Sequence, residues 1–372
     1  MKSIKVTNTG GPEVLKLEDI TLEKPGADEV QIEHVSIGLN YIDTYHRSGL
    51  YPLQLPTGIG MEAAGIVKEV GSNVSNFSVG DKIAYAAAPL GAYSTHRNYT
   101  SKNIVKVPDD IDLEQISSAM TKGMTTFYLL YKTYVPKEGE TVLFHAAAGG
   151  VGQFFCQWAK SLRLKVIGTV GSNEKVEIAK KYGCDEVINY SKEDFAKKVL
   201  ELTNDKGVSV VYDGVGKTTY DKSIECLKLR GTMVSFGNAS GPLDPIIVSK
   251  SLQPKGIYFV RPAMNQYFTN SEEKVETAKK YGCDEVINYS KEDFAKKVLE
   301  LTNGRGVSVV YDGVGKTTYD KSIECLKLRG TMVSLEMHQV PLTQLLYQNL
   351  CNQKVFISLD LLWINTLQIV KK

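Results

Sequence analysis

A glycine-rich turn joins a short apolar run, TVLFHA (141–146), to the helical pattern GQFFCQWAKSL (152–162). Residues 146–152 of this turn read AAAGGVG. Glycines in such a turn let the backbone approach a pyrophosphate closely, and the free N–H groups of the following helix favour its negative charge. The spacing A-x-x-G-G-x-G differs by one step from the usual G-x-G-x-x-G. We expect a dinucleotide to bind here; a turn with only a structural role is the alternative.

A polar segment, GSNEK (171–175), follows the next apolar run, KVIGTV (165–170). Enzymes that use NADH usually carry an acidic residue about 20 residues after the glycines, where it binds the ribose 2′-hydroxyl. Here Ser172 stands in that place and Lys175 follows, with Glu174 between them. Because a hydroxyl and an ammonium suit a 2′-phosphate better than a carboxylate does, the sequence favours NADPH over NADH.

The elements that must position these residues are of two kinds. The first 120 residues contain short β-type runs closed by glycine and proline, which predict a small, mostly β domain. From about Met120, apolar runs alternate with helical stretches, which predicts a doubly wound parallel sheet. Ser191 and Asp194 have the spacing of a capping box and predict a helix over 191–204. The expected strands are 30–39, 63–71, 81–87 and 103–108 in the first part, and 141–146, 165–170, 186–190, 208–213, 231–237 and 256–261 in the second.

A long internal repeat sets this chain apart. Residues 174–235 recur as residues 273–334 with three substitutions. The repeated segment predicts three helix–strand pairs but lacks the glycine-rich turn, so the second copy adds no second phosphate-binding loop. The first copy follows its neighbouring strand directly, and loop-closure entropy favours its insertion by roughly one or two kcal/mol. We expect the first copy to occupy the sheet and the second to pack beside it or to exchange with a partner subunit. The substituted residues are Ile178, Asp205 and Lys206, which become Thr277, Gly304 and Arg305.

Composition argues against several classes of function. The chain has 372 residues, 42% of them hydrophobic and 23% charged, with a formal net charge of +2, so it offers no electrostatic case for binding nucleic acid or a membrane surface. The N-terminus has no apolar stretch of signal-peptide length, and we expect a cytoplasmic protein. None of the six cysteines is spaced as C-x-x-C, so neither a zinc lobe nor a redox dithiol is indicated.

Six motifs before residue 272 belong together: GGPEVL (10–15), GLNYIDTYHRSGLYP (38–52), GMEAAGIVKEVG (60–71), LGAYSTH (90–96), LFHAAAGGVGQ (143–153) and MVSFGNASG (233–241). They resemble the zinc-independent quinone oxidoreductases of the medium-chain dehydrogenase/reductase superfamily. The resemblance implies a GroES-like catalytic domain over 1–122, a Rossmann NADPH-binding domain over 123–272, and a homodimer. The half-Rossmann repeat (273–335, matching 174–236) and an unassigned tail (336–372) would follow.

The same resemblance implies roles for individual residues. Asn40, Tyr45 and Thr126 would line the nicotinamide end of the cofactor. Asn40 and Tyr45 are the candidate catalytic residues, because each could hydrogen-bond the acceptor carbonyl or the carboxamide. The other implied cofactor-binding residues are Tyr41, Ile42, Asp43 and Thr44, then Gly149, Gly150, Val151, Gly152, Ser172, Lys175 and Tyr190 for the phosphates, and Gly216, Phe236, Gly237 and Asn238 at the border of the cleft.

Zinc is not expected from the residues at the places where the alcohol-dehydrogenase branch carries Cys and Gly-His-Glu. Here those places read GLNY (38–41) and GME (60–62), and an amide and a thioether are poor zinc ligands. Hydride transfer without a metal suits an acceptor that takes up the electrons itself. We therefore predict an NADPH-dependent reductase of quinones or other electron-poor conjugated carbonyls.

The resemblance ends where the family's chain returns to complete its catalytic domain. In this chain residues 270–272 lead into the second copy, and the tail 337–372 carries no motif that resembles the family. The alternative is therefore a catalytically impaired NADPH-binding protein with a structural or binding role. His145, at the end of a predicted strand, is interpreted as structural.

Overall fold

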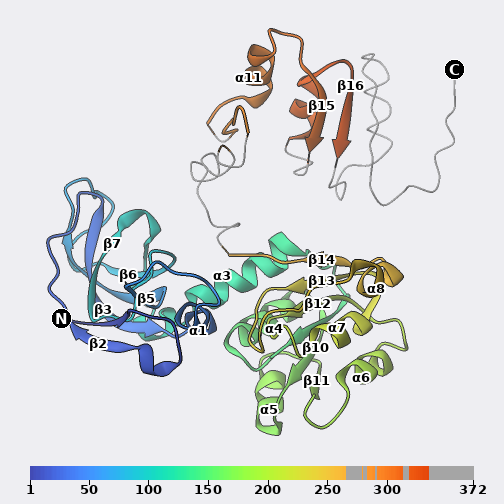
Figure 1. Cartoon of the computed structure of the whole chain (residues 1–372), viewed down its shortest axis with the longest axis horizontal. Helices are drawn as coiled ribbons and strands as arrows, with labels where there is room; N and C mark the ends of the chain where they lie inside the picture. Colours follow the sequence, from blue (N-terminus) through green and yellow to red (C-terminus); the bar gives the residue numbers. More distant parts are fainter. Residues whose placement is uncertain (265–278, 280–282, 290, 313–317, 335–372) are drawn as a thin grey trace. The chain divides into compact units, whose positions relative to one another are not determined.

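The computed structural model describes residues 1–264, 279, 283–289, 291–312 and 318–334. The chain divides into two compact units, unit 1 (Met1–Tyr267) and unit 2 (Phe268–Lys372), and each is considered by itself (Figure 1). The expected domain boundary at residue 272 and the tail 336–372 lie outside the described residues. Within the described part, no helix is long and apolar enough to cross a membrane.

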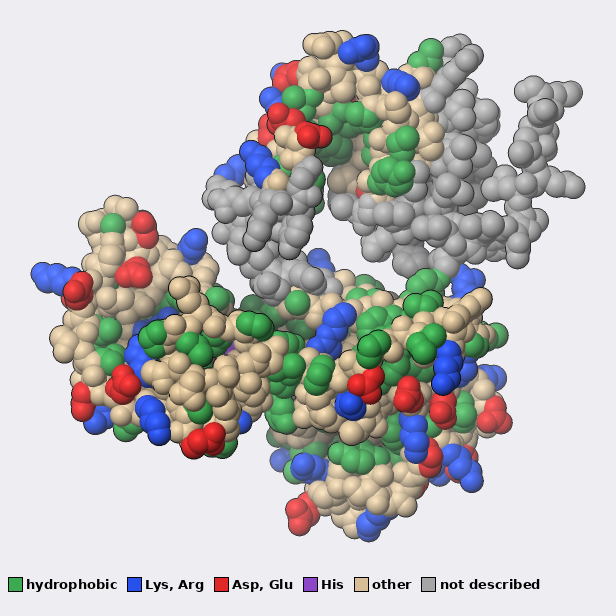
Figure 2. All heavy atoms as spheres, viewed as in Figure 1, with side chains coloured by type: hydrophobic (Ala, Val, Ile, Leu, Met, Phe, Trp, Pro, Cys, Tyr) green, Lys and Arg blue, Asp and Glu red, His purple; other side chains and the backbone are tan. Residues whose placement is uncertain are grey.

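On the face drawn in Figure 2, Lys and Arg side chains are interspersed with Asp and Glu.

Unit 1 begins with two antiparallel sheets, which confirm the predicted mostly β, GroES-like part. The four expected strands all form, and their apolar residues meet in a core that includes Ile32, Ile83 and Tyr99, each fully buried. One sheet has the order β2-β1-β4 and the other β7-β3-β5-β6-β8. Their bounds are β1 Lys2–Val6, β2 Lys16–Asp19, β3 Glu29–Gly38, β4 Thr57–Gly58, β5 Glu62–Val70, β6 Lys82–Ala86, β7 His96–Thr100 and β8 Val105–Lys106.

Three helical segments accompany this β part and lead out of it. The helix α1 (Tyr41–Ser48) follows β3, and α2 (Leu113–Ile116) and α3 (Met120–Tyr128) follow β8. A π-helical turn over Leu129–Thr133 continues α3. None of these helices was expected from the sequence pattern, because the β-type runs around them dominate its periodicity.

The second part of unit 1 is a six-stranded parallel sheet with the order β11-β10-β9-β12-β13-β14, which confirms the predicted Rossmann-like fold. Alternate residues of the central strand β9 face opposite sides. Phe144 packs with Phe155 of α4, while Leu143 packs with Val199 of α6, so helices cover both faces. The strands are β9 Thr141–His145, β10 Lys165–Val170, β11 Glu186–Asn189, β12 Val208–Asp213, β13 Leu227–Ser235 and β14 Tyr258–Val260. The helices are α4 Gly150–Ser161, α5 Asn173–Lys181, α6 Phe195–Leu202, α7 Tyr220–Cys226 and α8 Val248–Ser251.

The helix expected over 191–204 is shorter than predicted. It begins at Phe195, and Asp194 is its N-cap, because the Asp194 carboxylate accepts hydrogen bonds from the N–H groups of Ala196 (3.0 Å) and Lys197 (3.3 Å). The Ser191 hydroxyl instead donates to the carbonyl of Gly171 at 2.8 Å. The capping-box interpretation of Ser191 was therefore wrong, since a tertiary contact uses the hydroxyl and Asp194, three residues later, caps the helix instead.

Unit 2 contains the second copy, which folds only in part like the first. Its elements are α11 (Phe294–Leu301), β15 (Val307–Asp312), α12 (Tyr319–Glu324) and β16 (Leu326–Ser334), and β15 pairs with β16 in the register of β12 and β13. Residues 285–288 repeat the sequence of β11 but form no strand, which corrects the strand expected in the first of the three helix–strand pairs of this copy. In unit 1 that strand pairs with β10, and the repeat contains no copy of β10.

Burial differs sharply between identical strands of the two copies. Tyr212 of β12 is fully buried, whereas its counterpart Tyr311 of β15 is 73% exposed. Val210 is fully buried and Val309 is 39% exposed. The strand β12 is buried because it pairs with β9 and because the rings of Phe144 and Phe155 pack against Tyr212. The first copy therefore lies in the six-stranded sheet, as the loop-closure argument predicts.

Matched substitutions at this tyrosine pair should have very different effects. Tyr212 stacks near Phe155, with ring centroids 4.7 Å apart, and its hydroxyl donates to the carbonyl of Tyr134 at 3.3 Å. We expect Tyr212→Ala to lower the free energy of unfolding by about 3 kcal/mol or more. Tyr311→Ala should change it by less than about 0.5 kcal/mol, because the side chain is exposed. Calorimetric melting of both full-length variants measures this; equal destabilisation would contradict the assignment of the first copy to the sheet.

Candidate functional site

The glycine-rich turn connects β9 to α4 and leaves the start of α4 open. Gly149 is the N-cap and provides no side-chain hydrogen bond to the first turn, where no acidic residue stands either. A Cβ atom on Gly152 would lie 2.4 Å from the carbonyl oxygen of Ala147, so only glycine fits there. The N–H groups at this end of α4 are left without side-chain partners, and such groups are the kind of donors that bind anions.

The carboxyl ends of β10 and β11 carry three more of the expected residues: Ser172 and Lys175 follow β10, and Tyr190 follows β11. Ser172 is the N-cap of α5, but its hydroxyl makes no capping bond. Lys175 is exposed in the first turn of the same helix. The Tyr190 hydroxyl lies against Gly171, where an added Cβ would be 2.7 Å from it. The structure thus places Tyr190 beside the residue that precedes Ser172 and brings a hydroxyl, a phenol and a cation to one edge of the sheet.

Two further loops lie at the carboxyl ends of β12 and β13. The buried carboxylate of Asp213 accepts hydrogen bonds from the N–H groups of Val215 (2.7 Å) and Gly216 (3.0 Å). Gly216 has a φ of 93°, which favours glycine. A Cβ on Gly237 would lie 2.4 Å from the carbonyl oxygen of Gly214, so these loops touch. Phe236 is half-buried and packs against the core under the turn.

The helix α1 meets the loop after β13. The N–H of Asn238 donates to the Tyr45 hydroxyl at 2.9 Å, and the Tyr41 hydroxyl donates to the carbonyl of Ala239 at 2.9 Å. Tyr45 is buried, and this burial raises the pKa of its hydroxyl. Its edge faces the rings of Tyr41 and Tyr51. Tyr45 therefore lies between the β part and the Rossmann part of unit 1.

The remaining residues of this segment have local partners. The Thr44 hydroxyl donates to the carbonyl of Tyr41 at 2.7 Å, and Ile42 is half-buried. The Asp43 carboxylate accepts hydrogen bonds through Oδ2 from the N–H of Asn40 (3.0 Å) and from the Tyr93 hydroxyl (2.8 Å), while Oδ1 is buried without a partner. Burial raises the pKa of Asp43, against the opposing effect of these hydrogen bonds.

Asn40 is held by a buried carboxylate that sequence reasoning missed. Glu62, fully buried at the start of β5, accepts hydrogen bonds from Asn40 Nδ2 and from the N–H of Thr121 (2.9 Å). On the other side, the Lys122 ammonium lies 3.5 Å from Asn40 Oδ1. A carboxylate within the apolar run GMEAAGIV was the available signal, since a charge in a buried strand requires hydrogen-bonding partners.

Thr126 stands apart from the other candidates. It lies on α3, is fully buried, and its Oγ1 has no hydrogen-bond partner in the described part of the chain. Leaving a buried hydroxyl unpaired costs about 1–3 kcal/mol. Such an atom fits a ligand that supplies the missing partner, and so does the open start of α4. The residues present therefore fit a dinucleotide.

His145 belongs to a buried network rather than to the cleft. Its two ring nitrogens are each 2.8 Å from a hydroxyl, Nδ1 from Thr169 and Nε2 from Ser223. Burial lowers its pKa, so the ring is neutral. With both nitrogens engaged, His145 has a structural role, as interpreted from its position at a strand end.

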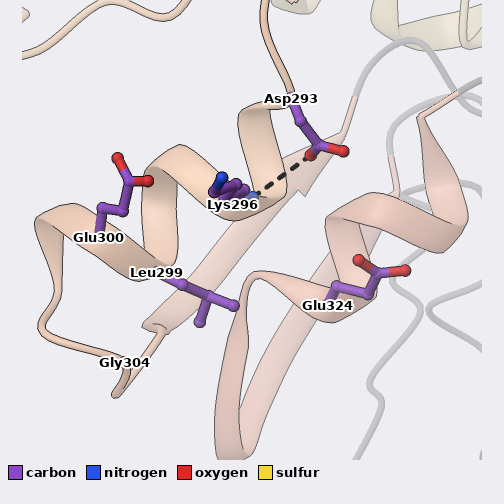
Figure 3. Close-up of a pocket in the computed structure, with 6 residues that line it drawn as sticks. All are labelled: Asp293, Lys296, Leu299, Glu300, Gly304 and Glu324. Carbon is purple, nitrogen blue, oxygen red and sulfur yellow. Dashed lines mark hydrogen bonds between the residues drawn. The ribbon is translucent and has the colours of Figure 1, made fainter.

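A separate pocket in unit 2 contains none of the expected site residues. It is lined by Asp293, Lys296, Leu299, Glu300, Gly304 and Glu324 (Figure 3). Asp293 caps α11 and pairs with Lys321 at 2.6 Å, so its charge is already neutralised within the unit. Among the residues that the structure describes, no group of three or more His, Cys, Asp or Glu side chains could hold a metal ion.

Comparison with known proteins gives the family. The family model described as "Alcohol dehydrogenase GroES-like domain" matches residues 26–109, and that described as "Zinc-binding dehydrogenase" matches residues 150–267 and again 267–370. Quinone oxidoreductase from Pseudomonas aeruginosa is 50% identical over 272 residues, which cover 73% of this chain and 84% of the relative. A 2-haloacrylate reductase from a Burkholderia species is 46% identical over 277 residues, 73% of this chain and 83% of the relative.

A solved structure agrees with these matches. The crystal structure of Escherichia coli quinone oxidoreductase complexed with NADPH matches with a TM-score of 0.71 and 46% identity, covering 76% of this chain and 86% of that one. The GroES-like part and the Rossmann-like parallel sheet are thus found together in a family of oxidoreductases. The chain belongs to the quinone oxidoreductases of the medium-chain dehydrogenase/reductase superfamily.

Proposed function

We propose that this chain transfers a hydride from NADPH to a quinone or to another electron-poor conjugated carbonyl compound. The observation that carries the proposal is the meeting of four strand ends of one parallel sheet, at the place where such sheets bind their ligands. These ends bear the glycine-rich turn after β9, Ser172 after β10, the Gly216 loop after β12 and Asn238 after β13. The relatives named quinone oxidoreductase support the same reaction.

Each part of the cofactor would have its own residues. Gly149–Gly152 would bind the pyrophosphate at the start of α4. Ser172, Lys175 and Tyr190 would bind the 2′-phosphate, since the Ser172 hydroxyl is not used as a cap and Lys175 is exposed. Thr126 would give its unpaired hydroxyl to the nicotinamide end. The other bordering residues would be Tyr41, Ile42, Asp43, Thr44, Gly216, Phe236, Gly237 and Asn238.

Tyr45 and Asn40 differ in what they can offer to an acceptor. The Tyr45 hydroxyl accepts a hydrogen bond from Asn238 and keeps its own proton to donate, and its raised pKa keeps it protonated at neutral pH. The Asn40 amide already bonds Glu62 and lies beside Lys122. We therefore assign Tyr45 as the donor toward the acceptor carbonyl or the carboxamide, and Asn40 as a residue that orders its neighbours. NADPH supplies the hydride when bound, and the chain orients it and excludes water.

The acceptor is defined by chemistry. A quinone and an enone share a conjugated carbonyl that takes up the hydride's electron pair, and the Burkholderia relative is named for reduction of a haloacrylate, another conjugated carbonyl compound. The alternative of a catalytically impaired binding protein has no support among the relatives, which are named as oxidoreductases.

A homodimer would cover one of the two open edges of the parallel sheet, the one formed by β14. Among the described strands, β14 pairs only with β13, and Tyr258 on it is 40% exposed. Ile247 and Val248, which precede it in the chain, are 60% and 63% exposed. An open sheet edge with apolar neighbours is usually covered in stable proteins. A second copy of the same chain, pairing through this edge, is the occupant we propose.

The dimer can be tested at the exposed apolar pair. Replacing Ile247 and Val248 together by Asp should shift the full chain from dimer to monomer in sedimentation velocity, because two charges would have to be buried at the interface. Leu17→Asp, at a residue 63% exposed on β2, is the control and should leave the dimer intact. A dimer that survives the double substitution would contradict the proposed edge.

Oxidation of the reduced cofactor tests the reaction itself. With 1,4-benzoquinone as acceptor, the full chain should oxidise NADPH with a kcat/KM roughly tenfold or more above that for NADH, because a charge-assisted bond to the 2′-phosphate contributes about 1.5–3 kcal/mol. Comparison of benzoquinone with an alkenal separates quinone from enone reduction. Tight NADPH binding without turnover of either acceptor would instead support the binding-protein alternative.

The 2′-phosphate assignment has a matched control within the repeat. Lys175→Ala should raise KM for NADPH roughly tenfold and leave KM for NADH within about twofold, because NADH lacks the phosphate. Lys274 has the same flanking residues in the second copy but follows no glycine-rich turn. Lys274→Ala should therefore change neither constant. If Lys175→Ala affects NADPH and NADH equally, Lys175 does not bind the 2′-phosphate.

A further inference from the structure

The side chain of Lys122 lies across the start of α4. Lys122 is the third residue of α3, and a Cβ atom on Gly150 would lie 2.6 Å from Lys122 Cε and 3.0 Å from its Cδ. Gly150 is the first residue of α4, so the lysine stem passes over the open end of the glycine-rich turn. A side chain at position 150 would displace the end of the Lys122 side chain from the start of α4.

Positive charge collects at this point. A cation in the first turn of a helix opposes the helix dipole, and Lys122 stands in the first turn of α3 while touching the first turn of α4. No carboxylate of the described residues lies within 4.0 Å of the Lys122 ammonium. Burial raises the pKa of nearby Asp43, and Lys122 is one of the groups that oppose that rise. Two helix starts and an ammonium together create a site for an anion.

Asn40 and Glu62 keep this arrangement in place. The Lys122 ammonium lies 3.5 Å from Asn40 Oδ1, and Asn40 Nδ2 donates to Glu62. The other oxygen of Glu62 accepts from the N–H of Thr121 at 2.9 Å and so caps α3 from the strand β5. Because Glu62 is fully buried, these contacts are shielded from water. They hold the first turn of α3, from which the Lys122 side chain extends.

Thr126 is a second, independent sign of a ligand on the same side of α3. It follows Lys122 by four residues, so both side chains lie on one face of the helix. Thr126 is fully buried and its hydroxyl is unpaired in the described part of the chain. The face of α3 that carries Lys122 therefore also carries a hydrogen-bonding group without a partner.

We propose that Lys122 binds the pyrophosphate of the dinucleotide, at the phosphate nearer the nicotinamide, and that Asn40 and Glu62 position it for this contact. The proposal rests on the proposed function, because it places the phosphates at the start of α4. An ammonium donating to a phosphate oxygen forms a charge-assisted hydrogen bond, and the helix N–H groups bind the same anion from the other side.

The Kd values of three ligands, each measured by titration calorimetry on the full chain, separate the contributions of the individual phosphates to binding. NADPH and 2′-phospho-ADP-ribose carry the whole pyrophosphate, whereas 2′,5′-ADP carries only the adenosine-side phosphate and the 2′-phosphate. Lys122→Met should raise the Kd of the first two roughly tenfold or more, and leave the Kd of 2′,5′-ADP within about twofold. Lys122→Arg should retain binding of all three within about threefold, since the charge is kept.

Lys132, exposed on the π-helical turn that continues α3, provides the matched control. Lys132→Met removes one positive charge of unit 1 and should leave all three Kd values unchanged. Unchanged binding of 2′-phospho-ADP-ribose by Lys122→Met would overturn the proposal, and so would equal weakening of all three ligands. Failure of the unmodified chain to bind NADPH would instead refute the proposed function. This titration comes first, before any variant is made.

Discussion

The pairing of β12 with β9 is the interaction on which the rest of unit 1 depends. β9 has only two edges, one taken by β10 and the other by β12, so it can accept one copy of the repeated strand VSVVYD. The hydrogen bonds of this ladder are what place Tyr212 against Phe155 and bury it fully. The same six residues in β15 pair only with β16 among the described strands, and Tyr311 is mostly exposed. Burial here is a property of the pairing and not of the local sequence.

The same pairing brings the functional groups to one edge of the sheet. Parallel strands in register end at the same edge of the sheet. The turn after β9, the helix start after β10 and the Asp213 loop after β12 therefore lie near one another although they are distant in the sequence. Contacts from α1 and α3 then close the site from the other part of unit 1. Tyr45 reaches Asn238, and Lys122 reaches Gly150. The candidate site is thus assembled from one edge of the parallel sheet and from the helices α1 and α3.

Much of this arrangement could be predicted from the sequence, because its signals are local. A strand, a glycine-rich turn and a helix follow one another directly around residue 150, and Ser172 stands at the end of the next strand. Three features could not be predicted, since each depends on a partner distant in sequence. Glu62 is bonded by Asn40 and Thr121, Lys122 lies against Gly150, and residues 285–288 lack a copy of β10, which the repeat does not contain. The start of α6 at Phe195 is set by the Asp194 cap, while the Ser191 hydroxyl bonds to the distant carbonyl of Gly171.

The unequal burial of the two copies also bears on the history of the chain. A buried tyrosine in β12 tolerates few replacements, whereas an exposed one in β15 tolerates many. Selection on packing therefore constrains the first copy far more than the second, and over time the second should diverge. Yet the copies differ at three positions, of which Ile178 in the first copy is itself 38% exposed. The three differences are therefore far fewer than the exposure of the second copy would permit.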